Sequence, residues 1–436
     1  MRINKEKVKE LMNKKGIATQ TELAELLGIT KNQLSVMLST KFNPIKSNVL
    51  NLCELLGVTP MDLLESEENT EVVHNSKNLL IAESTIEYTV PKTKTNFTVL
   101  ELFAGGGGLA LGLEQAGLKT TALIEIDKQA CETLKHNRPQ YNVINEDVRN
   151  IDFTKFNVDV VTGGFPCQAF SYAGKKLGFE DTRGTLFFEF ARAVKEIKPK
   201  LFMAENVRGI INHDKGRTLK TIIQILTDLG YHVEYRLMNA VNYGVPQKRE
   251  RVVIVGTQKG CRFNYPKQQK KILTLQEALK DVPKSEGMQY SARRKQVLEL
   301  VPPGGCWRDL PLEIQKDFMG KSFYSGGGRT GMARRLSWDE PCLTLTTSPS
   351  QKQTERCHPD EVRPFTVREY ARIQTFPDWW EFKGSMSDKY KQIGNAVPVK
   401  LAFQLGQAIV SCLSSHNSTN LIESDYEDSD QLALSI

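Results

Sequence analysis

The chain has 436 residues, of which 40% are hydrophobic and 25% are charged, a composition that excludes disorder throughout and allows two or three folded domains. Its 58 Lys and Arg against 51 Asp and Glu give a formal net charge of +7, which permits a nucleic-acid partner without demonstrating one. The eight cysteines include no CxxC pair, and no apolar run reaches the roughly 18–20 residues of a membrane span. We therefore expect a cytoplasmic protein with no metal site, no disulfide scaffold and no membrane segment.

Residues 1–68 are predicted to form short helices joined by tight turns. The first helix ends at Gly16, the second runs from about Thr19 to Gly28, and Thr30 is suited to cap a third. This pattern resembles the helix-turn-helix of phage-repressor-type DNA-binding domains, and the alternative is a small helical bundle that contacts other proteins. In the first interpretation, the side chains that would enter the major groove are Lys31, Asn32 and Gln33.

Two polar segments are predicted to lie outside the folded domains. Residues 69–95 are polar and charged, as in a linker. Residues 414–436 combine serines with closely spaced acidic residues, which cannot all be buried in a core. We expect this second segment to be an acidic flexible tail.

Residues 96–256 show an α/β pattern, in which apolar segments alternate with segments of helical periodicity. Such alternation is typical of a parallel sheet covered by helices on both faces. The predicted strands are 98–103, 121–126, 158–162 and 200–204, and the predicted helices are 109–116, 183–197 and 218–229. Residues 257–362 break the pattern with many Gly, Pro, Lys and Arg residues, and they are predicted to form a separate smaller domain.

A glycine cluster, LFAGGGGLALG, lies at the junction of the first predicted strand and helix. Glycines there allow a ligand to approach the backbone, and the helix N-terminus offers free N–H groups. Glu125 ends the next strand, where a carboxylate can accept hydrogen bonds from a ribose. Asp147 follows a third apolar strand and could meet an adenine amino group. Together these features predict a nucleoside-containing cofactor, without distinguishing NAD from S-adenosylmethionine.

Three polar groups follow further apolar strands, at the edge where open α/β sheets bind ligands. Cys167 lies in the turn GGFPCQAFS, Glu205 begins the segment ENV, and QKRER places Arg249 and Arg251 on one face of a strand. A lone cysteine is usually a small buried hydrophobe. A nucleophile, an acid and a guanidinium from three strand ends instead indicate a multi-residue active site.

With these motifs in this order, residues 98–410 resemble the DNA (cytosine-5)-methyltransferase family of bacterial restriction–modification systems. Two later segments extend the resemblance, RPFTVREYARIQTFP from Arg363 and QIGNAVP from Gln392. Glu101 departs from the family pattern, in which Asp is common before LFAG, but it keeps a carboxylate. The resemblance implies a Rossmann-like S-adenosylmethionine-dependent methyltransferase sheet at 96–256, a target-recognition domain at 257–362, and a segment at 363–413 that returns to the sheet.

The resemblance also implies roles for individual residues. Cys167 would be the nucleophile, Glu205 would hold or protonate the cytosine ring nitrogen, and Arg249 and Arg251 would orient the ring. Positions matching cofactor contacts are Phe103, Gly105, Gly107, Glu125, Ile126, Asp147, Val148, Pro166, Leu186 and Asn395. The match at Asn395 predicts a helix over 400–410 packed on the N-terminal half of the sheet. Candidate DNA contacts in the target-recognition domain are Thr344, Leu345 and Arg329.

The implied partners are double-stranded DNA and a functionally linked restriction endonuclease. The implied cofactor is S-adenosylmethionine, which is converted to S-adenosylhomocysteine. Operator DNA is a further expected partner if the N-terminal domain represses transcription of its own operon. An enzymatic alternative is a tRNA C5 methyltransferase, which shares the PCQ and ENV elements. A non-enzymatic alternative is a DNA-binding regulator with an inactive methyltransferase fold, although Cys167, Glu205 and Arg251 are all intact.

Overall fold

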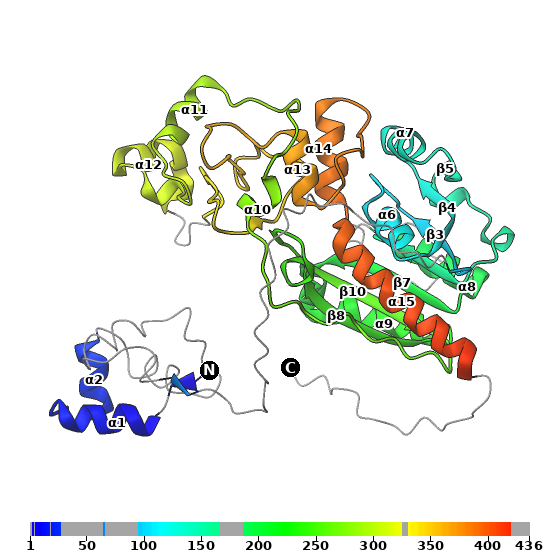
Figure 1. Cartoon of the computed structure of the whole chain (residues 1–436), viewed down its shortest axis with the longest axis horizontal. Coiled ribbons are helices and arrows are strands. Elements are labelled where there is room, and N and C mark those ends of the chain that lie inside the picture. The colour runs from blue at the N-terminus through cyan, green and yellow to red at the C-terminus, as the bar shows by residue number, and fades with distance from the viewer. Residues whose placement is uncertain are drawn as a thin grey trace, which may run out of the picture. The chain divides into compact units, whose positions relative to one another are not determined.

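The computed structural model describes residues 2–3, 5–17, 19–27, 64–65, 95–165, 186–324 and 330–419 of the chain. The chain divides into two compact units, Met1–Thr85 and Ile86–Ile436, which are drawn together in Figure 1. The boundaries predicted within the second unit, at 256 and 362, stay a prediction.

The described part of the first unit contains two helices that the sequence predicts. Its elements are β1 (Arg2–Ile3), α1 (Lys5–Lys14), α2 (Gln20–Leu26) and β2 (Leu64–Glu65), with β1 and β2 paired antiparallel. Gly16 follows α1 with a φ of +72°, and the Glu22 amide donates to the Thr19 Oγ1 that caps α2 at 3.1 Å. Lys31, Asn32 and Gln33 lie outside the described residues.

A seven-stranded sheet with the order β5-β4-β3-β6-β7-β10-β8 is the centre of the second unit. Its strands are β3 (Thr98–Leu102), β4 (Lys119–Glu125), β5 (Val143–Asn145), β6 (Val160–Gly163), β7 (Leu201–Val207), β8 (His232–Asn239) and β10 (Glu250–Thr257). The four predicted strands are present. The sheet is parallel, as predicted, except for β10, which runs antiparallel to both of its neighbours.

The reversed direction of β10 decides where its first residues lie. Since β10 is antiparallel to β7, its beginning lies at the carboxyl edge of β7, where Arg251 pairs with Val207 and Val253 pairs with Glu205. An arginine from the start of one strand therefore reaches the same edge as an acid from the end of another.

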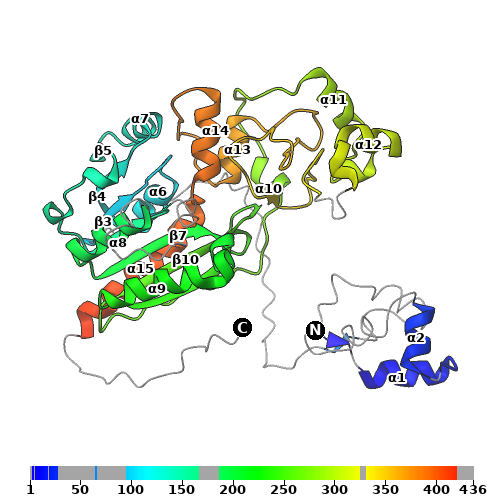
Figure 2. The same ribbon diagram turned by 180° about the vertical axis from the view of Figure 1, so that it is seen from behind.

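Two helical layers cover the sheet (Figures 1 and 2). One face carries α6 (Gly108–Gln115), α7 (Lys128–Asn137) and α15 (Val399–Thr419), and the other carries α8 (Leu186–Ile197) and α9 (Arg217–Asp228). At Gly112 the two helices α6 and α15 approach so closely that an added Cβ would lie 2.4 Å from Ala402 Cβ. The predicted helix over 400–410 is confirmed, and it continues to Thr419, past the expected start of the tail at 414.

The segment between β10 and α15 adds short elements and a core of its own. They are α10 (Leu275–Leu279), α11 (Ala292–Glu299), α12 (Leu312–Met319), β11 (Cys342–Leu343), α13 (Val367–Ile373) and α14 (Met386–Asn395). Leu298, Trp307 and Met319 belong to the separate core. β11 pairs in parallel with β9 (Gln247–Lys248), which joins this segment to the sheet domain.

The C-terminal helices α14 and α15 are packed inside the protein. The stretch Met386–Ser415 is long and apolar enough to span a membrane by length and composition, but 61% of its most apolar window is buried inside the protein, as in a core helix. Cys261 and Cys412, the latter on α15, are both buried free thiols, and their Sγ atoms lie 2.7 Å apart.

Within the described ranges, no three His, Cys, Asp or Glu side chains come together as a metal site.

Candidate active site

A largely buried ion pair joins two of the predicted catalytic residues at the carboxyl edge of the sheet. Arg251 Nε lies 2.6 Å from Glu205 Oε1, and the two side chains are only 12% and 14% exposed. Glu205 comes from the end of β7 and Arg251 from the beginning of β10. The structure therefore brings the predicted acid and guanidinium together, and the reversal of β10 makes this possible.

The backbone that leads to Cys167 starts beside this pair. An added Cβ on Gly164 would lie 3.1 Å from Glu205 Oε2. The next residue, Phe165, accepts a 2.9 Å hydrogen bond from Asn206 Nδ2 through its carbonyl oxygen. Asn206 thus ties the ENV segment to the start of the cysteine turn. Pro166 and Cys167 themselves lie outside the described residues.

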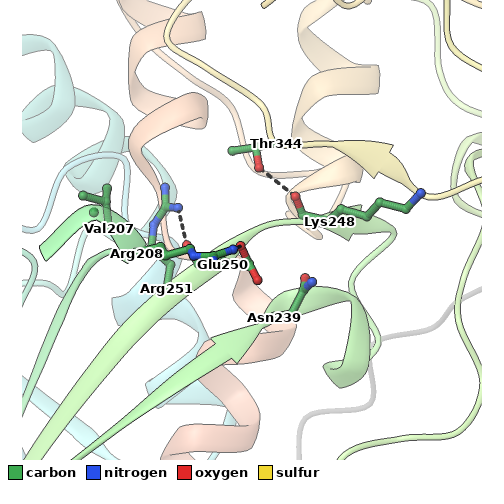
Figure 3. Close-up of a pocket in the computed structure, with 8 residues that line it drawn as sticks. Val207, Arg208, Asn239, Lys248, Glu250, Arg251 and Thr344 are labelled. Atoms are coloured by element: carbon green, nitrogen blue, oxygen red, sulfur yellow. Dashed lines mark hydrogen bonds and ion pairs between the residues drawn. The ribbon is translucent and has the colours of Figure 1, made fainter. Parts of the chain in front are cut away.

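A cleft of about 470 Å³ opens next to Arg251 (Figure 3). We call it the Arg251 cleft, and its side-chain lining is Val207, Arg208, Asn239, Lys248, Glu250, Arg251 and Thr344. Thr344 crosses from the segment after β11 and donates its hydroxyl to the Lys248 carbonyl at 2.7 Å. The cleft is therefore bounded by the sheet on one side and by the segment between β10 and α15 on the other.

Arg249 does not line the Arg251 cleft. It is 1% exposed, and its guanidinium donates to the backbone oxygens of Leu345 at 3.2 Å and Asn395 at 3.4 Å. Burial, and next the charge of Arg251, lowers the pKa of Arg249 to about 9, which still leaves it protonated at neutral pH. In this structure Arg249 holds two distant segments together.

Thr344 and Leu345, two of the candidate DNA contacts, are anchored by side chains from several elements. Leu345 is 1% exposed, and its amide donates to Gln247 Oε1 at 2.9 Å. Gln247 in turn donates to Gln374 Oε1 at 2.9 Å. The guanidinium of Arg356 donates to the Thr344 carbonyl at 2.6 Å. The buried Leu345 side chain fits an anchor better than a DNA contact, while Arg329 lies outside the described residues.

Gln374 and Arg356 were not singled out as site residues from the sequence. Gln374 lies in the quoted motif YARIQTFP, which could have marked it, whereas Arg356 lies in no motif. Arg208, which lines the Arg251 cleft, directly follows ENV and could have been found by its position.

The glycine cluster forms a strained loop between β3 and α6. Phe103, Gly105 and Gly107 have φ values of +59°, +54° and +86°. An added Cβ on Gly107 would lie 2.6 Å from Leu134 and 2.8 Å from Trp380, so the loop is packed tightly on that side. An added Cβ on Gly105 would meet nothing within 4 Å, so the loop is open there. Backbone N–H groups beside open space suit a ligand.

Glu125 supports this loop with both carboxylate oxygens. Gly105 N donates to Oε2 at 2.7 Å and Asp127 N donates to Oε1 at 2.8 Å. Each oxygen keeps a further lone pair that a ribose hydroxyl could use. The next residue, Ile126, is 66% exposed, which is unusual for a large aliphatic side chain beside a polar loop and suits an adenine face.

Glu101 lies below the loop and is 2% exposed. Its Oε2 has no hydrogen-bond partner among the described residues. Burial, and next the charge of Glu125, raises the pKa of Glu101 well above its ordinary value. Burial thus favours the neutral form of this carboxyl, which can be buried at a lower cost than a carboxylate.

The remaining predicted cofactor positions differ in exposure. Asp147 pairs with Arg149 at 2.5 Å, and this contact lowers the pKa of Asp147 to about 2. Val148 is 4% exposed, and Leu186 is partly buried. Asn395 is exposed, and the adjoining Ala396 would lie 3.1 Å from an added Cβ on Gly108. The C-terminal segment therefore returns to the glycine loop, as predicted.

Gly105, Glu125 and Ile126 together fit a nucleoside cofactor. The open side of Gly105, the carboxylate of Glu125 and the exposed Ile126 follow one another along the carboxyl edge of β3 and β4. That edge also carries the Glu205–Arg251 pair. A cofactor held there would lie on the same side of the sheet as the cleft.

Comparisons with known proteins agree with this geometry. The family described as C-5 cytosine-specific DNA methylase matches residues 97–411, and the Cro/C1-type HTH DNA-binding domain matches residues 7–69. The Type II methyltransferase M.Sau96I of Staphylococcus aureus is 51% identical over 96% of this chain and 100% of its own length. M.Eco47II of Escherichia coli is 64% identical over 74% of this chain and 80% of its own length. A solved structure of a putative DNA modification methyltransferase from an E. coli prophage covers 73% of this chain and all of its own, with 24% identity and a TM-score of 0.54, which supports the fold.

Proposed function

Since the chain belongs to the C-5 cytosine-specific DNA methylase family, we propose that its Glu205–Arg251 site methylates C5 of a cytosine flipped out of a specific duplex sequence, with S-adenosylmethionine as the methyl donor. The chain is a DNA (cytosine-5)-methyltransferase of the type II class that carries a Cro/C1-type HTH domain at its N-terminus. The observation that carries the residue assignment is the buried ion pair beside the start of the segment that leads to Cys167.

Each residue of the proposed site has a chemical task. The thiolate of Cys167 would add to C6 of the base, which makes the electrons of the C5–C6 double bond available at C5. Glu205 would hydrogen bond to or protonate the ring nitrogen and so offset the negative charge that this addition places on the base. Arg251 would fix the Glu205 carboxyl from 2.6 Å. Loss of the C5 proton to solvent, after methylation, would then expel the thiolate.

Bound S-adenosylmethionine would supply an electrophilic methyl group. Glu125 and Ile126 would hold its ribose and adenine, with Asp147 at the far end of the same edge. The tightly packed side of the glycine loop at Gly107 would fix the backbone that faces the cofactor. Arg249 would act indirectly, because it positions Leu345 and Asn395.

Transfer of tritium from methyl-labelled S-adenosylmethionine to duplex DNA tests this proposal, with Cys167→Ala as the matched inactive variant. The proposal predicts label in duplex DNA for the wild-type protein and a loss of at least about a thousandfold for Cys167→Ala. Label in tRNA only would support the RNA alternative. Label in neither substrate would support an inactive, regulatory fold.

A second role is proposed for the N-terminal domain. The Cro/C1-type match over residues 7–69 and the described helices α1 and α2 support binding to operator DNA. A gel shift of the full-length Cys167→Ala protein should then favour its own promoter over a shuffled duplex. Replacing Lys31, Asn32 and Gln33 together by Ala should abolish this preference. Equal binding to both duplexes would contradict autoregulation.

The naming of the relatives as type II methyltransferases supports two further proposals. The methylated sequence would be the one that a cognate restriction endonuclease cleaves, so that host DNA is protected. The enzyme would work in the cytoplasm, on the nucleoid DNA. Digestion of host DNA with candidate endonucleases, before and after loss of this gene, measures the protection.

A further inference from the structure

Three of the four charged side chains that line the Arg251 cleft are cations. Its charged lining consists of Arg208, Lys248 and Arg251 against Glu250. The Arg251 charge is already balanced by Glu205, which lies deeper at 14% exposure. Each of the three cations therefore has an acidic partner, but the two outer cations stay accessible, with Arg208 62% exposed and Lys248 45% exposed.

Arg208 is held by the single acid of the mouth. Its Nη1 donates to Glu250 Oε2 at 2.7 Å, and Glu250 is 36% exposed. An ion pair this exposed contributes little to stability, so Arg208 can exchange its partner at low cost. Lys248 contacts Glu340 at 3.1 Å, and Glu340 does not line the cleft.

The position of this pair connects it to the reaction. Arg208 comes three residues after Glu205 in the chain, and Glu250 directly precedes Arg251. The exposed pair thus lies next to the Glu205–Arg251 pair in the chain, with Arg208 directly after the end of β7 and Glu250 at the start of β10. A planar guanidinium binds a phosphodiester in the same way as it binds a carboxylate, through two parallel N–H groups.

We propose that Arg208 binds a backbone phosphate of the DNA substrate, that Glu250 occupies the place of this phosphate until DNA arrives, and that Lys248 adds a second cationic contact at the cleft mouth. This inference rests on the proposed function for the identity of the polyanion. On binding, Arg208 exchanges its carboxylate partner for a phosphate. Each phosphate neutralised by the protein releases counterions and so steepens the salt dependence of binding.

The test compares Arg208→Gln with Glu250→Gln in the full-length protein. Binding to a fluorescein-labelled duplex is measured by anisotropy across a series of salt concentrations. Arg208→Gln should weaken binding about three- to fivefold and lower the slope of log Kd against log salt by about 0.9. Glu250→Gln should tighten binding about two- to fivefold, because it frees Arg208. Both variants remove the same ion pair, so opposite shifts cannot come from the loss of the pair itself.

Two further variants complete the design. Arg208→Lys keeps the positive charge and should therefore recover most of the slope of log Kd against log salt. If Arg208→Gln proves unstable, Arg208→Lys still tests whether the charge sets this slope. Lys155→Gln removes an ion-paired cation that is 78% exposed, against 62% for Arg208, and that lies before the start of β6, away from the cleft; this variant should bind like wild type. Weakening by both Arg208→Gln and Glu250→Gln, with an unchanged slope, would overturn the inference. If the wild-type protein binds the duplex but methylates none, the proposed function fails, while the opposite shifts still decide the inference.

Discussion

At the scale of single residues, Glu205 and Arg251 depend on each other. Their side chains are 14% and 12% exposed and 2.6 Å apart, so removal of one leaves the other charge poorly solvated. Arg251→Gln should therefore lower kcat/KM for DNA methylation by at least about a hundredfold. Arg251→Lys should recover part of this loss, since it restores the charge without the planar geometry. An activity within threefold of wild type for Arg251→Gln, measured by tritium transfer, would contradict this role.

The glycine loop offers a matched pair of substitutions. Gly107→Ala places a Cβ 2.6 Å from Leu134 at a φ of +86°, whereas Gly105→Ala meets no atom within 4 Å at +54°. Both pay for a left-handed backbone, about 1 kcal/mol, but only Gly107→Ala adds a steric cost of about 1–3 kcal/mol. Urea unfolding without cofactor should show this difference in the free energy of unfolding. Equal losses in the free energy of unfolding for the two variants would mean that Leu134 and Trp380 can move aside to make room for the added Cβ.

Glu101 should make stability depend on pH. Its folded pKa is raised above the unfolded value by burial and by Glu125, so the native state binds its proton more tightly. The stability that Glu101 contributes is then fully present below about pH 4.5 and is lost progressively as pH rises toward the folded pKa. Glu101→Gln should flatten the fall in the free energy of unfolding as the pH rises above about 4.5. The free energy of unfolding is measured by urea titration at each pH. The same pH dependence for the wild-type protein and Glu101→Gln would show that Glu101 is not the source of the fall.

At the scale of elements, the contact between α6 and α15 returns the C-terminal segment to the cofactor loop. Gly112→Ala would bring a Cβ to 2.4 Å from Ala402 Cβ and 2.6 Å from the Val399 oxygen. Overpacking of this kind costs about 1–3 kcal/mol. The double variant Gly112→Ala with Ala402→Gly should recover only part of the loss, because the backbone clash remains. Thermal unfolding measures the stability of the single and the double variant. Full recovery of stability in the double variant would show that α6 and α15 can move apart without cost.

Elements also show what the sequence could not predict. Periodicity indicates that residues 250–257 form a strand, but it does not indicate the strand's direction, which depends on long-range pairing with β7 and β8. The sequence predicts Arg249 beside Arg251 on one face of a strand, where both would orient the cytosine ring. It is buried, because the carbonyls of Leu345 and Asn395, about 100 or more residues away in the chain, accept its hydrogen bonds.

At the scale of the whole molecule, the order of the motifs was sufficient to predict the main architecture. The glycine loop, Glu125 and Glu205 each follow a predicted strand, and the carboxyl ends of parallel strands meet at one edge. The return of the C-terminal helix followed from Asn395 through the resemblance alone. The internal connections of the target-recognition segment, such as Arg356 with Thr344, could not be predicted, because no periodic pattern marks them.

The central claim is that Cys167 attacks the cytosine that is methylated, and covalent trapping tests it most directly. A duplex in which the target cytosine carries fluorine at C5 cannot lose a proton there, so the thiolate should stay bonded to C6 after methylation. With S-adenosylmethionine present, mass spectrometry of the digested complex should place the nucleotide adduct on the peptide that contains Cys167, and Glu205→Gln should form it more slowly. No adduct with a duplex that the protein methylates, or an adduct on another residue, would contradict the account.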